Sequence, residues 1–394
     1  MFAVDVVLFV SAVVILFGSI ALSIKMRFIQ ITMLPQLVRS FFISLTSGKT
    51  ADGGRTVVPH KALFTAMSTT LGISTMISPV IAIKLGGPGA LIGYLVSTLF
   101  GAAATFSEVA LSLKFRKRTA DGTIMGGPMQ YLADLISAPL AKWYALSCGL
   151  LMAAWCGAQS NQLAAILSSP QLGSWAMPKM ATGAILALFV ICFLIGGIKW
   201  IAELSGKLVP LMFTLYLGTS LWIVASNIDL LPHIFSVIMH SFLSPSEFAT
   251  GVCIGGLVSS LRWGVFKGVH SNEAGLGTQT IPHSMAETDK PYEQATLAMA
   301  STYTAGFIAI LSGLVALISD TWQNPHLTVG IDMVAASFQL YFAEWGFAII
   351  AICATLFGLG TVLGNCFNGT HCFQYLTKNR YTKLFYVGSA VVIF

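Results

Sequence analysis

The chain has 394 residues, of which 9% are charged and 56% are hydrophobic, with 21 Lys plus Arg against 15 Asp plus Glu. Soluble domains carry about 25% charged residues, so this composition excludes a soluble enzyme, a disordered chain and a nucleic-acid-binding protein. The 37 glycines follow no Gly-X-Y period, which excludes collagen. The composition predicts a multi-pass protein of the lipid bilayer.

Apolar runs of about 20 residues, the length that spans a bilayer, recur along the chain. The first follows Asp5 without a basic leader, so residues 1–26 are predicted to be a retained transmembrane helix and not a signal peptide. Residues 27–60 are amphipathic and basic at their start, and we expect a helix at the cytoplasmic interface followed by a loop, or a loop throughout. The later apolar runs are 63–83, 85–107, 143–178, 180–198, 208–228, 294–319, 345–377 and 384–394.

Positive charge is distributed unevenly between alternate loops. With alternating spans, the loops 229–248 and 320–344 lie on one side of the membrane and contain no Lys or Arg. Most of the cations fall on the other side, in loops 25–62, 114–142, 199–207, 288–293 and 378–383. Because basic loops stay in the cytoplasm, the chain is predicted to lie in the plasma membrane, the inner membrane of a bacterium, with its N-terminus outside.

Two apolar segments contain helix-breaking residues. The first is interrupted near L-G-I-S-T-M-I-S-P (71–79). The second is the segment 248–287, and its interruption is expected near 269–277, a stretch that includes S-N-E-A-G-L-G. Four spans separate them, so each opens a five-span unit, 61–228 and 249–394, joined by an outer loop at 229–248. An odd number of spans gives the two units opposite orientations. Unwound backbone in a membrane is tolerated where it lines a polar cavity, which we favour over two kinks in packed helices.

Several motifs resemble the alanine or glycine:cation symporter family, also called the sodium:alanine symporter family. They are S-N-E-A-G-L-G (271–277), I-P-H (281–283), T-D-K-P (288–291), L-G-G-P-G-A (85–90), G-G-P-M-Q-Y (126–131) and L-F-G-L-G-T (356–361). The resemblance implies an all-α LeuT-type fold, a 5+5 inverted repeat behind one extra N-terminal helix. The chain stops at Phe394 within the expected ninth core helix, so the last core helix is expected to be missing.

The same resemblance implies sodium-coupled symport of small neutral amino acids, with the sodium ion as coupling ion and no other cofactor. The residues expected to bind the amino acid are Gly72, Ile73, Ser74, Thr75, Gln159, Asn161, His270, Gly275, Leu276 and Gly277. The residues expected to bind sodium are Ser68, Leu71, Thr75, Ser271 and Thr361. For Gln159 and Asn161 the alternative is bonding between helices, and His270 stands where an aromatic lid is usual. Family members read G-T-G-N where this chain has Gly72 to Thr75, which weakens the expected sodium site.

Other functions are considered beside sodium symport. A proton-coupled transporter or an inactive truncated paralogue fits the same motifs. A channel is less well supported because no T-V-G-Y-G filter is present. The sequence contains neither H-E-x-x-H nor G-x-S-x-G, so no enzymatic activity is expected.

The predicted topology can be tested by labelling. A single Cys introduced within 120–124 should react with an impermeant thiol reagent only from the cytoplasmic side, and one within 322–328 only from outside, because the basic loops fix the orientation. Reaction of both positions from the same side would refute the predicted number of spans.

Overall fold

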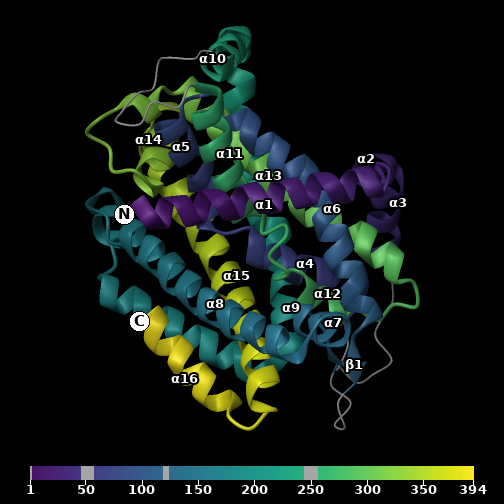
Figure 1. Ribbon diagram of the computed structural model, residues 1–394. Coiled ribbons are helices and arrows are strands. Elements are labelled where there is room, and N and C mark those ends of the chain that lie inside the picture. Colours follow the sequence, from purple (N-terminus) through teal and green to yellow (C-terminus); the bar gives the residue numbers. More distant parts are fainter. Residues whose placement is uncertain (1, 46–56, 119–123, 244–255) are drawn as a thin grey trace.

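The computed structural model describes residues 2–45, 57–118, 124–243 and 256–394, and they are mostly helical (Figure 1). Residues 120–123 of the predicted cytoplasmic loop, and 248–255 at the start of the second interrupted segment, lie outside the described residues. Among the described residues, four helices are long and apolar enough to cross a membrane, and a bent pair makes a fifth span. The chain is therefore an integral membrane protein, as predicted.

The helices up to the middle of the chain are α1 (Phe2–Lys25), α2 (Ile29–Thr32), α3 (Leu34–Leu45), α4 (Pro59–Thr70), α5 (Ile73–Gly86), α6 (Ala90–Lys114), α7 (Pro128–Leu135), α8 (Ala138–Leu167) and α9 (Lys179–Ser226). Those that follow are α10 (Leu231–Leu243), α11 (Gly256–Asn272), α12 (Thr280–Ser284), α13 (Pro291–Ile318), α14 (Ile331–Phe342), α15 (Glu344–Thr377) and α16 (Thr382–Ile393). Three short 3-10 turns are η1 (Pro170–Trp175), η2 (Ile228–Leu230) and η3 (Thr321–Gln323). One antiparallel hairpin joins β1 (Lys117–Arg118) to β2 (Ile124–Met125).

Helix α9 is long enough to cross a membrane twice. At 1.5 Å per residue a continuous helix of its length would be about 72 Å long, more than twice the hydrocarbon thickness. Gly197 divides it, because its positive φ of 67° leaves the helical region, which glycine does at little cost. The two parts correspond to the expected spans 180–198 and 208–228.

Most of the helices pack in two groups. In the first, α6 packs against α11 and α13, and these contact the bent pair α4–α5 and the short α12. In the second, α8 lies along α15, and both contact α9 and α16. Figure 1 shows the second group below α1, with α8, α15 and α16 side by side. We call the first group the bundle and the second the frame. The frame and bundle meet where α4 packs on α9 and α15.

Two segments expected as connecting loops contain helices. In 229–248, α10 buries Ile234, Ile238 and Ser241 at helical spacing, and the Ser241 hydroxyl accepts a hydrogen bond from the backbone N–H of Gly89. In 320–344, α14 buries Phe338, which stacks on Tyr216. Packing of one apolar face against the ends of the spanning helices turns both connections into helices.

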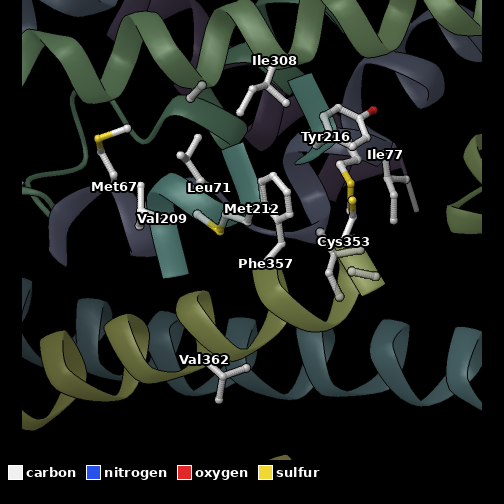
Figure 2. Close-up of a cluster of buried hydrophobic side chains, with 14 of the residues drawn as sticks. Met67, Leu71, Ile77, Val209, Met212, Tyr216, Ile308, Cys353, Phe357 and Val362 are labelled. Carbon is white, nitrogen blue, oxygen red and sulfur yellow. The ribbon is translucent and has the colours of Figure 1, made fainter. Parts of the chain in front are cut away.

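A hydrophobic core joins the frame to the bundle beside the end of α4 (Figure 2). Leu71, Met212 and Phe357 are fully buried there, and Ile308 on α13 completes the cluster. The Phe357 ring meets the Tyr216 ring edge-on at 5.9 Å. This core holds the end of α4 against α9 and α15, so the position of the first helix interruption is fixed by packing.

Helices α6 and α11 approach each other through glycine. A Cβ atom on Gly264 would lie 2.1 Å from the carbonyl oxygen of Ala90 and 2.9 Å from the Cα of Gly93. Membrane helices use such small residues because close backbone approach gives the packing that lipid cannot supply.

This contact predicts the effect of one added methyl group. Gly264→Ala should lower the thermal unfolding temperature of the purified protein in detergent, since separating the helices costs about 1–3 kcal/mol. Gly206→Ala is the control, because a Cβ there meets nothing within 4 Å. Equal unfolding temperatures for the two variants would contradict the close contact.

Candidate functional site

The first helix interruption lies at Leu71 and Gly72, at the start of the predicted stretch 71–79, where α4 and α5 meet at 45°. Side chains pair with the backbone groups that the break exposes. Thr75 Oγ1 donates to the Thr70 carbonyl (2.8 Å), and Thr361 Oγ1 donates to the Leu71 carbonyl (3.1 Å). The N–H of Ile73 donates to Gln159 Oε1 (3.1 Å). The break is thus held by α8 and α15 of the frame.

The second interruption covers residues 273–279, between α11 and α12. Gln279 Nε2 donates to the Asn272 carbonyl (2.8 Å) within the segment. Two side chains of the frame donate to the unwound backbone: Tyr144 to the Leu276 carbonyl (2.8 Å) and Asn368 to the Thr278 carbonyl (3.1 Å). The backbone groups exposed at both interruptions are therefore hydrogen-bonded by side chains of the same two frame helices, α8 and α15. The core of a bilayer holds no water that could pair with these groups instead.

A cavity of about 180 Å³ lies between the two interruptions. It is lined by residues of α4, α5, α8, α11 and α15, together with Glu273. Thr69, Ser271 and Asn365 lie at one end, which we call the inner end. Along α5, α8 and α11 the lining continues to Ile81, Gln162 and Lys267, at the outer end. A cavity of this size has the volume of about six water molecules at 30 Å³ each, which suits a small ligand.

The predicted residues that line the cavity are Ser74, Gln159, His270, Ser271 and Thr361. Gln159 links α8 to α5, since its Nε2 also donates a hydrogen bond to Ser74 Oγ (3.3 Å). The His270 ring meets the Trp155 ring edge-on at 5.1 Å, and these two rings form one wall.

Gly72 borders the cavity without appearing in its lining. A Cβ atom at this position would lie 2.8 Å from Thr361 Oγ1 and 2.9 Å from Gln159 Nε2. Glycine is therefore required for the close approach of α5, α8 and α15. Ile73 is buried against Gly358 of α15, away from the cavity lining.

Four other predicted substrate residues also lie outside the lining. Asn161 is exposed on α8, because two residues along a helix place it on the face opposite Gln159. Gly275 faces Ile15 of α1, while Gly277 approaches Pro128 and Tyr144. Leu276 contributes its carbonyl to the bond with Tyr144.

The structure brings three of the five expected sodium residues together. The Thr361 hydroxyl contacts the Leu71 carbonyl, and the carbonyl of Ser68 lies beside Gly360 on the same helix as Thr361. Thr75 instead stabilises the first interruption, because its hydroxyl also accepts a hydrogen bond from the N–H of Gly72 (3.3 Å). Ser271 lies on the opposite wall, on α11.

Sequence reasoning missed ten of the fifteen lining residues, among them Thr69, Trp155 and Asn365. Asn365 could have been found, because it follows Thr361 by four residues and so lies on the same helix face. Nothing in the sequence marked Trp155, which faces the cavity because of how α8 is rotated.

The model of the sodium:alanine symporter family matches residues 2–394. The chain belongs to this family. It is 33% identical to the sodium/alanine symporter AgcS of Methanococcus maripaludis over 97% of this chain and 84% of that protein. It is 32% identical to an uncharacterized transporter of Haemophilus influenzae (92% and 79%), and 27% identical to the probable sodium/glutamine symporter GlnT of Bacillus subtilis (95% and 76%). The predicted family is confirmed, and it is a family of transporters, not enzymes.

A solved structure supports the same fold. The chain is similar to a Na⁺-coupled sialic acid symporter in a substrate-bound outward-open state, with a TM-score of 0.57 and 14% identity. The likeness covers 97% of this chain and 78% of the other. This member of the sodium:alanine symporter family therefore shares the overall fold of a sodium-coupled symporter.

The crowding at Gly72 predicts a specific loss of activity. Gly72→Ala should reduce transport in proteoliposomes at least tenfold, because the new methyl group displaces Thr361 and Gln159. Gly218→Ala is the control, since a Cβ there has open space. Thermal unfolding measured in parallel separates a damaged site from a damaged fold, and normal transport by Gly72→Ala would contradict the assigned geometry.

Proposed function

We propose that the protein is a secondary symporter that moves a small neutral amino acid of the alanine or glycine class together with sodium, by alternating access on a LeuT-type 5+5 fold. The observation that carries this proposal is the cavity enclosed between two interrupted helices. The bundle contains the first two spans of each predicted repeat. In the first repeat these are α4–α5 and α6, and in the second they are α11–α12 and α13. The frame contains later spans of both repeats, as two inverted repeats would arrange them.

The first interruption supports recognition of an amino acid. The N-terminus of α5 carries the positive end of the helix dipole, which favours a carboxylate. Gln159 is held in place by Ile73 and Ser74. In this proposal the ammonium group lies near the carbonyl end of α11, and the rings of Trp155 and His270 bound the ligand from the side.

The proposed sodium site lies between the end of α4 and α15. It uses the carbonyl oxygens of Ser68 and Leu71 and the hydroxyl of Thr361, because hard cations prefer oxygen ligands. Thr75, where the family has Asn, is engaged at Thr70 and Gly72. We therefore assign Thr75 to holding the break, and place sodium on the other three residues.

The contacts on the inner side suit alternating access. Tyr144 and Asn368 of the frame bond to the unwound backbone at Leu276 and Thr278, and Ser205 Oγ of α9 donates to Ser68 Oγ of α4 (3.2 Å). These bonds close the inner side, while the lining continues outward to Lys267. Opening to the cytoplasm would exchange these frame–bundle bonds for water.

Sodium coupling predicts a dependence on both the ion and Thr361. Uptake of labelled alanine or glycine into proteoliposomes should fall at least tenfold when choline or K⁺ replaces Na⁺. Thr361→Val should raise the sodium concentration needed for half-maximal uptake, because it removes one oxygen ligand and keeps the shape. Thr355→Val, which removes a hydroxyl of α15 outside the cavity, is the matched control.

Each competing function gives a different result. Uptake that is unchanged without Na⁺ but abolished by a protonophore would reassign the coupling ion to H⁺. No uptake under any gradient, by folded protein, would favour an inactive paralogue.

A further inference from the structure

The inner end of the cavity contains an amide side chain without a partner. Asn365 on α15 is fully buried and lines the cavity. Neither its Oδ1 nor its Nδ2 atom makes a hydrogen bond to any residue that the structure describes. Because a buried polar group left unpaired is costly, its position in a cavity points to a ligand that pairs with it.

Other polar groups surround the same end. The Ser271 hydroxyl is buried and lines the cavity, and it lies close to the hydroxyl of Tyr94 on α6. The hydroxyl of Thr69 donates to the Ala66 carbonyl (2.7 Å), which leaves its oxygen able to accept. Toward the outer end the lining of α5 includes apolar Ile77 and Ile81. Ser78, Gln162 and Lys267 line the outer part as well, but among the lining residues it is Asn365 that has a buried amide with both polar atoms unpaired.

The position of Asn365 indicates which part of an amino acid it would meet. Thr361 contacts the carbonyl of Leu71 at the first interruption, where the proposed function places the carboxylate group. Asn365 lies one helical turn, about 6 Å, further inward on the same face of α15. An amino acid bound beside Thr361 would therefore reach Asn365 with a side chain of two or three atoms.

We propose that Asn365, with Ser271 and Thr69, forms a subsite for a substrate side chain that carries a hydroxyl or amide group. The preferred substrate is then a short polar amino acid such as serine, and this inference rests on the proposed amino-acid transport. An amide both donates and accepts, so it pairs with either group. A site built in this way rejects an apolar analogue because its own polar groups would stay unpaired.

Serine and 2-aminobutyrate test the subsite, since they differ by a hydroxyl in place of a methyl group. The full chain in proteoliposomes should take up serine at least about tenfold more efficiently than 2-aminobutyrate. Asn365→Leu should bring this ratio close to one, with alanine uptake by the same variant as the measure of functional protein. Asn227→Leu, which removes an amide at the end of α9 that donates to the Ile223 carbonyl, should keep the wild-type ratio.

The outcomes separate the two proposals. Equal ratios in the wild type and Asn365→Leu overturn the subsite and leave the transport function intact. A wild-type protein that does not distinguish serine from 2-aminobutyrate overturns the subsite even if the variant fails to fold. Folded wild-type protein that accumulates none of the three amino acids refutes the transport function, and the subsite with it.

Discussion

The need to satisfy backbone hydrogen bonds inside a membrane governs this structure. The chain is unwound at two places, between α4 and α5 and between α11 and α12, and the hydrocarbon layer holds no water to pair with the backbone groups that this exposes. Side chains replace it: Thr361 and Gln159 at the first break, Tyr144 and Asn368 at the second. Because these four come from α8 and α15, the two breaks are held in register by one pair of frame helices.

This arrangement links site and motion. The bonds at the first break border the cavity, whereas those at the second break close its inner side. A ligand that alters the position of α4 or α11 therefore changes the bonds that join bundle and frame. The buried core of Leu71, Met212 and Phe357 packs the end of α4 against the frame beside these bonds.

The chain also shows how a divergent residue can change role. Thr75 stands where the resemblance to the family predicts an asparagine in the first broken helix. Its hydroxyl bonds to the Thr70 carbonyl and the Gly72 N–H, and so stabilises the unwound turn from within. At the other wall, Asn365 brings an unpaired amide into the cavity. The polarity of the site is therefore distributed differently from what the motif alone implied.

The sequence by itself determined the membrane class, which depends on composition and apolar run length, and the family, which its motifs indicate. The glycines at 72, 275 and 277 lie at the two unwound segments, but the second break was expected near 269–277 and covers residues 273–279. The resemblance to the family pointed to Gln159 and Thr361, and both side chains line the cavity. Only the tertiary structure decided which neighbours face the cavity. Asn161 and Asn365 are both amides in apolar spans, and the rotation of α8 and α15 about their axes exposes the first and buries the second. That rotation is set by packing with distant helices, which no local pattern encodes.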